Sequence, residues 1–300
     1  MSQLSSLHEA ARRRENVSTR MRDKTRIISR RTALAAIGAA PALASIYGTK
    51  RVTAFALAGD RYHNLDYIRT ALGKTIVRDL GISVDFTDEL SLLDAKNLKD
   101  YKLLIVFRDG MIWPNGYSDD GPGQAGGGLR GIVSEPPVPH SEGNAVYWIT
   151  PAQGKEVKAF VENGGAALFY HNTTYISPHN ADFRDVLGAV TEEHPPLRPF
   201  KVRITNQSHP ITRGVSDFVV TDEQHFVKYE KDPKYLLMES VNEDGKTWKD
   251  LGTTSPAGWA YDYGKGRVCC LAPGHLISAL WNPEYVKIQQ NAVKWLLRQL

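Results

Sequence analysis

Residues 150–172 read TPAQGKEVKAFVENGGAALFYHN and decide the class of fold. The segment Thr150-Pro-Ala-Gln153 is a capping box with proline at the first helical position, so it predicts a helix that begins here and ends at Asn163-Gly164. The apolar run Ala166–Tyr170 follows at once and predicts a central strand. A helix followed by such a strand is typical of βαβ units and a mostly parallel sheet.

The same alternation extends from this segment in both directions. Toward the N-terminus, Val52–Ala58, Ile82–Phe86 and Leu103–Phe107 are apolar runs, and a helix over residues 65–80 that Gly81 stops lies between the first two. Later segments predict antiparallel strands at Lys201–Thr205, Phe218–Thr221, Tyr235–Ser240, Gly258–Tyr263 and Arg267–Leu271. A last helix begins at Asn282-Pro283.

The pattern therefore predicts one α/β domain over residues 45–300, with a mostly parallel central sheet and added antiparallel strands. Residues 113–149 interrupt this domain. The part from Trp113 to Ala145 holds eight Gly and five Pro, which is too long for an ordinary connection. We expect a flap insertion there.

The first 44 residues differ from the rest in charge. Residues 1–44 hold nine Lys and Arg against three Asp and Glu, whereas the remaining residues hold 28 against 30. Arg30-Arg31, the uncharged stretch Thr32–Ala44 and the small residues of Ala42-Leu43-Ala44 are typical of a twin-arginine export signal. The stretch is too short for a stable membrane span, so we expect cleavage and a periplasmic or secreted protein. The alternative is a solvated basic tail before an Ala-rich helix, in a cytoplasmic protein.

The composition excludes several classes of protein. Hydrophobic residues make up 42% of the chain and charged residues 23%, which excludes disorder, collagen and a polytopic membrane protein. Because residues 45–300 carry a slight negative charge, we expect no nucleic acid as partner. The two cysteines, Cys269 and Cys270, are adjacent and fit neither a disulfide framework nor a zinc-site spacing.

Polar residues follow the ends of five predicted strands. In an open α/β sheet, ligands bind beyond the carboxyl ends of the strands, so these residues are candidates for a site. They are Asp60 with His63 and Asn64, Asp109, His171 with Asn172, Asp222-Glu223 with His225, and His275. Such imidazoles and carboxylates can hold a divalent metal (zinc, manganese or iron) or place a general base next to an acid. Because no HExxH or comparable spacing fixes the choice, a site without a cofactor stays open.

Nucleophilic catalysis has no support in the sequence. There is no G-x-S-x-G elbow, and both cysteines lie inside a predicted strand as small hydrophobes. Gly121-Pro-Gly-Gln-Ala-Gly126 has the form G-x-G-x-x-G, but it neither follows a strand nor opens a helix, so it is not a dinucleotide motif. Trp113 and Trp281 lie in loops among Gly, Pro and Asn, and they are candidates for stacking on a sugar ring.

Four stretches, in order, carry a resemblance to a known family. They are Gly164-Gly-Ala-Ala-Leu-Phe-Tyr-His171-Asn172, His194-Pro-Pro196, His209-Pro-Ile-Thr-Arg-Gly214 leading to Asp222-Glu-Gln-His225, and Tyr263-Gly-Lys-Gly-Arg-Val268 running to Gly274-His275 and Trp281. Over roughly residues 51–300 the chain resembles the ThuA-like, or trehalose-utilisation, family. It departs from the commoner form of that family in its flap and at Ala166-Ala167, where a third glycine is usual.

The resemblance implies a flavodoxin-like, three-layer sandwich, similar to class I glutamine amidotransferases, with the site at His171, Asp222, Glu223 and His275. Members of the family look like amidotransferases that have lost the catalytic cysteine, and this chain agrees. The resemblance therefore implies sugar metabolism, including oxidised (keto) sugars, and no glutaminase activity.

Our leading hypothesis is an exported hydrolase, lyase or isomerase that acts on a keto-sugar or glycoside by acid–base chemistry, with or without a metal. His171 or His225 would take a proton next to a carbonyl, Glu223 or Asp222 would orient it or bind metal, and His275 would polarise the oxygen. The catalytic candidates, which are also the metal ligands if a metal is bound, are His171, Glu223, His225 and His275. The substrate-binding candidates are His63, Asp109, Asn172, His194, Asp222, Trp113 and Trp281.

Two other hypotheses remain. One is a non-catalytic carbohydrate-binding protein, and the other is a true amidotransferase with an unusual nucleophile. The leading hypothesis and the carbohydrate-binding hypothesis both expect a small-molecule carbohydrate as partner. The oligomeric state is left open, and a homo-oligomer is one alternative.

Overall fold

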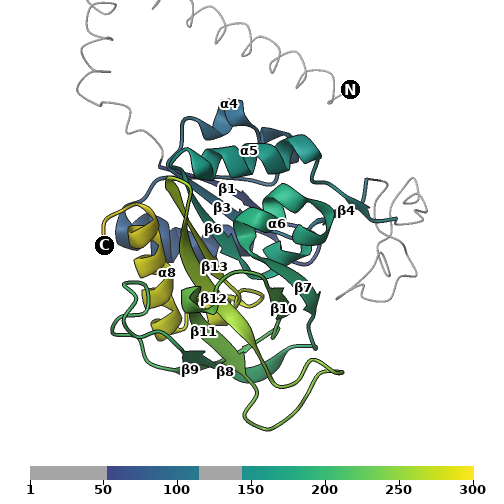
Figure 1. Cartoon of the computed structure of the whole chain (residues 1–300), viewed down its shortest axis with the longest axis vertical. Coiled ribbons are helices and arrows are strands. Elements are labelled where there is room, and N and C mark those ends of the chain that lie inside the picture. Colours follow the sequence, from purple (N-terminus) through teal and green to yellow (C-terminus); the bar gives the residue numbers. More distant parts are fainter. Residues whose placement is uncertain (1–52, 115–143) are drawn as a thin grey trace, which may run out of the picture. The chain divides into compact units, whose positions relative to one another are not determined.

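The computed structural model describes residues 53–114 and 144–300 of the chain. The predicted leader and most of the predicted flap lie outside the described residues. Nine of the described strands form one sheet in the order β2-β1-β3-β6-β13-β12-β11-β8-β9 (Figure 1). Their bounds in this order are Val84–Thr87, Ala54–Ala58, Leu103–Phe107, Ala166–Tyr170, Gly266–Leu271, Thr254–Tyr263, Leu236–Val241, Arg198–Ile204 and Phe218–Asp222.

Most strands of this sheet run in the same direction, so their carboxyl ends lie at the same edge. The pairs among β2, β1, β3, β6 and β13 are parallel, and the pairs from β13 through β12, β11 and β8 to β9 are antiparallel. Within this sheet only β12 and β8 therefore run against the rest. The carboxyl ends of β1, β3, β6, β9 and β13 lie at one edge, as the mixed, mostly parallel sheet predicted from the sequence requires.

Helices cover both faces of the sheet, which gives three layers. The helices α3 (Leu65–Leu72), α7 (Ile277–Leu280) and α8 (Pro283–Leu296) contribute to one buried cluster, and α4 (Ala95–Leu98), α5 (Pro151–Glu162) and α6 (Ala181–Leu187) contribute to the other. Side chains alternate between the faces of a strand, so Cys269 packs in the first cluster and Cys270 in the second. In the described ranges, no helix has the length and apolar character needed to cross a bilayer.

Helix α5 begins as the sequence predicts. The Thr150 hydroxyl accepts the Gln153 N–H at 3.2 Å, and the Gln153 side chain accepts the Thr150 N–H at 3.0 Å. The helix expected over residues 65–80 differs, because regular α3 ends at Leu72 and a π-helical turn spans Gly73–Arg78. The Thr75 hydroxyl donates to the Ala71 carbonyl, which competes with the regular backbone ladder.

The structure contains two small sheets that the sequence did not predict. Strand β7 (Ala189–Glu193) pairs with β10 (Phe226–Tyr229), and β4 (Met111–Ile112) pairs with β5 (Val146–Tyr147). The β4–β5 pair brings the two ends of the Gly/Pro-rich segment together. The β7–β10 pair has His194 directly after β7 and His225 directly before β10, which places both near the edge of the main sheet.

Candidate functional site

Polar residues that follow the carboxyl ends of the strands meet at one edge of the sheet. His63 follows β1, His171 follows β6, Glu223 follows β9 and His275 follows β13. The ring centroid of His63 lies 4.9 Å from that of His171 and 4.8 Å from that of His275. The His225 ring completes the group at 4.2 Å from His171. The structure thus brings together all four catalytic candidates and His63.

Glu223 lies at the centre of these imidazoles. Its Oε2 atom is 3.3 Å from His171 Nε2, 3.5 Å from His225 Nε2 and 3.1 Å from His275 Nδ1. Burial alone would raise the pKa of Glu223, but its interactions with the three rings outweigh burial and hold the pKa far below the usual range. Glu223 is therefore ionised. Its side chain is 14% exposed, so a ligand can reach it from solvent.

His171 has a backbone conformation that is rare for a residue with a side chain. Its φ of 48° lies in the left-handed region, which costs about 1–2 kcal/mol for a residue other than glycine. Its Nδ1 contacts the Ala272 carbonyl at 2.8 Å, which places the proton on Nδ1 and turns Nε2 toward Glu223. Gly274 allows this arrangement, because a Cβ there would lie 2.8 Å from the His171 Cβ. Burial lowers the pKa of His171, but the charges of Glu223 and Asp222 outweigh it and raise the pKa.

Asp60 ties three strand ends together and orients His63. Its carboxylate contacts His63 Nδ1 at 2.9 Å and accepts the Asn172 side-chain amide at 2.8 Å and the Asp109 N–H at 2.9 Å. Burial raises the pKa of Asp60, but these partners outweigh it and bring the pKa to about 2. The ionised carboxylate favours the proton on His63 Nδ1, so His63 Nε2 faces His275 Nδ1 at 3.1 Å with its lone pair.

Asp222, which we expected to bind substrate, to orient the base or to bind metal, performs the same task on the other side of the site. Asp222 is fully buried, and its two carboxylate oxygens accept the backbone N–H groups of Glu223, Gly274, His275 and Leu276. No part of the carboxylate is left for a ligand. Asp222 holds the β9 end against the loop that carries His275.

His225 and His194 form the flank of the site next to β7 and β10. Their rings are parallel, 4.8 Å apart, and the His194 side chain is 30% exposed. Neither ring nitrogen of the buried His225 has a hydrogen-bond partner among the described residues. Burial, together with the nearby His171, holds the pKa of His225 well below its usual value. Tyr175, which sequence reasoning did not select, contacts His225 edge-on at 5.8 Å.

Two groups of side chains in this site can hold a metal ion. In each group, one ligand atom of every residue lies within 4.8 Å of the others. The first group is His63, His171, Glu223 and His275, and the second is His194, Glu223 and His225. The metal ligands expected from the sequence were His171, Glu223, His225 and His275. The first group therefore contains His63 in place of His225. His63 was expected to bind substrate, and no linear spacing could indicate that it lies opposite His275.

The remaining candidates are placed as follows. Asn172 donates to Asp60, and Asp109 accepts the Met111 N–H at 2.8 Å. Burial beside ionised Asp60 raises the pKa of Asp109 to about 7. Trp113 lies next to this region, with the Arg61 guanidinium 4.9 Å from its ring.

Trp281 is not brought to the histidines. Its indole N–H donates to the Ala71 carbonyl at 3.4 Å, and the Lys74 amine lies 4.2 Å from its ring, so it packs against α3. The expectation that Trp281 binds substrate therefore has no support in its position.

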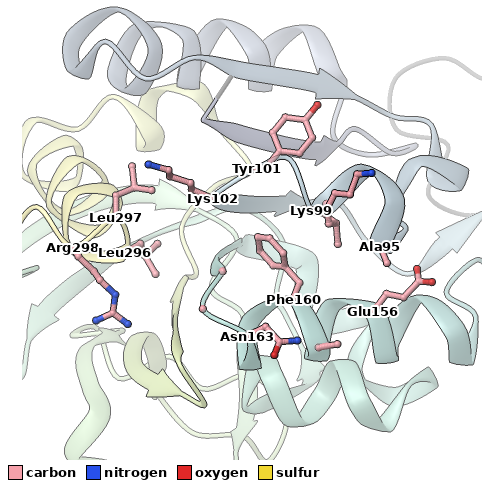
Figure 2. A pocket seen from close by; sticks show the side chains of 14 residues that line it. Ala95, Lys99, Tyr101, Lys102, Glu156, Phe160, Asn163, Leu296, Leu297 and Arg298 are labelled. Carbon is pink, nitrogen blue, oxygen red and sulfur yellow. The ribbon is translucent and has the colours of Figure 1, made fainter. Parts of the chain in front are cut away.

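The two cysteines are not nucleophiles. Both are fully buried in β13, and burial raises the pKa of each thiol. A cavity of about 580 Å³ has a lining that includes Lys102, Phe160 and Arg298. Figure 2 shows these side chains. Because Lys102 and Gly165 precede β3 and β6, this cavity lies at the amino ends of those strands, and none of the site residues lines it.

The chain is similar to proteins of one family. The sequence profile of ThuA, described as trehalose utilisation, matches residues 138–296. A putative ThuA-like protein from Bacteroides uniformis has a similar structure, with a TM-score of 0.57 and 17% identity over 83% of this chain and 93% of that one. A putative ThuA-like protein from Parabacteroides merdae gives 0.58 and 14% identity over 82% and 90%. At these identities the two structures show the shared fold alone. No curated protein sequence matches the chain.

Proposed function

The chain belongs to the ThuA family of trehalose utilisation, and from this premise we propose that it is an enzyme that processes a carbohydrate by acid–base chemistry. The family supports carbohydrate metabolism as the general setting. The observation that carries the proposal is the convergence of His171, His225 and His275 on one oxygen of Glu223. The proposed substrate is a keto-sugar or a glycoside that contains one, and glutamine hydrolysis is not the reaction.

A divalent metal (zinc, manganese or iron) is part of the proposal. Its ligands are His63 Nε2, His171 Nε2, His275 Nδ1 and Glu223 Oε2. Two neighbouring ligand atoms that share one metal at about 2.0–2.1 Å lie about 3 Å apart. The corresponding distances from Glu223 are 3.3 Å to His171 and 3.1 Å to His275.

The surroundings of these imidazoles support the same assignment. Histidines that bind metals usually donate their other ring N–H to a carboxylate or a backbone carbonyl, which fixes the tautomer and the ring orientation. Asp60 holds His63 in this way, and the Ala272 carbonyl holds His171. A metal held by these residues with a further coordination position open would polarise the carbonyl oxygen of the sugar as a Lewis acid.

His225 is the proposed general base. Its ring nitrogens are buried and make no hydrogen bond within the described ranges, so a lone pair is available for a proton from the carbon next to the sugar carbonyl. Glu223, 3.5 Å from His225 Nε2, stabilises the imidazolium that forms. The His194 ring stacks on the buried His225 ring and its side chain is 30% exposed, so we propose that a ligand reaches His225 past His194.

Metal analysis and turnover measured on the same preparation test this proposal. We expect one divalent metal per chain and turnover of at least one keto-sugar from a panel. The nearly isosteric Glu223→Gln variant should lose both the metal and turnover. His225→Ala should keep the metal and lose about 10²–10⁴-fold in rate.

The control is His179→Ala, which removes an exposed histidine that stacks on Tyr147 and should change neither property. Metal-free protein with no turnover would refute the proposal. Binding of sugars without turnover would instead favour a carbohydrate-binding protein, and release of ammonia from glutamine would favour an amidotransferase.

We also propose that residues 1–44 export the chain by the twin-arginine route to the periplasm or beyond. The support is the pair Arg30-Arg31 before the uncharged stretch that ends at Ala44. Replacing both arginines with lysine should leave the uncleaved chain in the cytoplasm. Unchanged location and an unchanged N-terminus in that variant would contradict this part of the proposal.

A further inference from the structure

Glu223 has a second carboxylate oxygen that the proposed metal site does not use. Its Oε2 atom faces His171 and His275, whereas its Oε1 atom lies 3.8 Å from His194 Nδ1. We infer that Glu223, His194 and His225 form a second, weaker metal site, and that a second divalent ion bound there inhibits the enzyme. The inference rests on the proposed function and adds the regulation of its site.

The three side chains supply the donor atoms of a common kind of metal site. One donor atom of each residue lies within 4.8 Å of the others, and His225 Nε2 is 3.5 Å from the Glu223 carboxylate. Two imidazoles and one carboxylate leave further coordination positions open, and such a set suits zinc, manganese or iron. His194 follows β7, Glu223 follows β9 and His225 precedes β10, so strand ends position all three.

His225 is a buried side chain that lacks a hydrogen-bond partner. It is only 3% exposed, and neither of its ring nitrogens is hydrogen-bonded within residues 53–114 and 144–300. An unpaired polar atom in the interior is costly, and coordination of a metal ion by a ring nitrogen would remove that cost. The His194 side chain, which stacks on His225 and is 30% exposed, gives an ion access from solvent.

The second site is weaker because its ligands are fewer and less well positioned. The first set has four ligands, with Glu223 3.3 Å from His171 and 3.1 Å from His275, whereas the second has three, at 3.5 and 3.8 Å from the carboxylate. His194 Nδ1 also contacts the Pro195 carbonyl at 3.0 Å, and a metal on Nδ1 would displace this hydrogen bond. The first ion therefore binds at low metal concentration and the second only in excess.

A second ion inhibits because it occupies the proposed general base. A neutral imidazole has one nitrogen with a free lone pair, and its other nitrogen carries a proton. If a metal takes that lone pair on His225, the ring cannot accept a proton from the sugar. Zinc should inhibit at lower concentration than manganese, because sites of nitrogen and oxygen ligands bind Zn²⁺ more tightly than Mn²⁺.

Metal titration of the full chain tests the inference with two kinds of readout. Equilibrium dialysis against zinc should show one tightly bound ion and a second that binds at least about tenfold more weakly. Turnover of the keto-sugar identified from the panel should rise with the first ion and fall about 10²–10⁴-fold as the second site fills. With manganese, electron paramagnetic resonance should show magnetic coupling between two ions that share the Glu223 carboxylate.

Three histidine variants assign the second ion to its ligands. His194→Ala removes a ligand of the second set and none of the first, so it should bind one zinc ion. Excess zinc should leave its rate equal to its own rate with one ion. His63→Ala has the reverse effect on the ligands and should lose the tight ion while it keeps the weak one. The control, His179→Ala, removes an exposed histidine outside both sets and should bind two ions and be inhibited like the wild type.

A wild-type chain that turns over a keto-sugar with one zinc ion, and neither binds a second nor loses rate in excess zinc, would overturn the inference and leave the proposed function standing. Wild-type affinity for the second ion in His194→Ala would overturn the inference as well. So would loss of the weak ion in a folded His63→Ala chain, which does not depend on the His194 variant. A chain without turnover that holds a zinc ion which only His194→Ala removes would refute the proposed reaction and support the second site.

Discussion

The Asp222→Asn substitution tests the contribution of a side chain that supports the backbone of the site and takes no part in its chemistry. Asp222 Oδ1 accepts the N–H groups of Glu223 and His275 at 2.7 and 3.0 Å, and Oδ2 accepts those of Gly274 and Leu276 at 3.1 and 3.4 Å. An amide has one oxygen, so two of these four donors would face an NH₂ group. Each buried donor left unpaired costs about 1–3 kcal/mol. After the lower desolvation cost of an amide is subtracted, we expect a loss of about 2–4 kcal/mol in the free energy of unfolding.

Urea denaturation at pH 7 and metal titration on the same protein measure this effect. The midpoint should fall with an unchanged m-value, and metal affinity should fall about 10–100-fold because His275 loses its position. The control is Asp217→Asn, since the Asp217 carboxylate is exposed and accepts a single backbone N–H, that of Ile204 at 2.8 Å. A stability of Asp222→Asn within about 0.5 kcal/mol of the wild type, or an equal loss in the control, would refute the reasoning.

Three further predictions concern neighbouring groups. Gly274→Ala should displace His171, because the added Cβ would lie 2.8 Å from the His171 Cβ; we expect weaker metal binding and at least about tenfold lower turnover, and unchanged values for both would contradict the close packing. The pKa of Asp109 is raised from 3.8 to about 7, so ionising its carboxyl group destabilises the folded state relative to the unfolded state. This destabilisation is absent below pH 3.8 and complete above about pH 7. Asp109→Asn should therefore stabilise the protein at pH 7.5 but not at pH 4, and denaturation midpoints that differ equally at both pH values would count against this. Asp60→Asn should weaken metal binding about tenfold in a competition with a chelator through its effect on His63, whereas full affinity would remove His63 from the ligand set.

The edge of the sheet where the site lies could be predicted from the sequence alone. Each apolar run of a mostly parallel sheet ends at the same edge, so His63, His171, Glu223 and His275 were selected from local pattern without any knowledge of their contacts. The same reasoning selected Asp222 but gave no sign of its four backbone contacts. A strand-end carboxylate that accepts four backbone N–H groups and one that contacts a ligand look identical in a sequence.

The parts that could not be predicted depend on contacts between distant segments. His63 faces His275 across more than two hundred residues, and only the strand order β1-β3-β6-β13 brings them together. The β7–β10 pair that positions His194 and His225 consists of short strands, and β7 has no uninterrupted apolar run. Trp281 has the loop setting of a sugar-binding residue, but its indole packs on α3 because an apolar helix face is available there.

The two cysteines have a consequence for the conditions under which this fold is stable. Cys269 and Cys270 are neighbours in the chain, yet they point into opposite cores of the sheet, and neither is reached by solvent. They cannot pair with each other, and the chain holds no third thiol. The fold therefore neither requires an oxidant to mature nor loses a crosslink to glutathione, and its stability should be the same on the reducing and the oxidising side of a membrane.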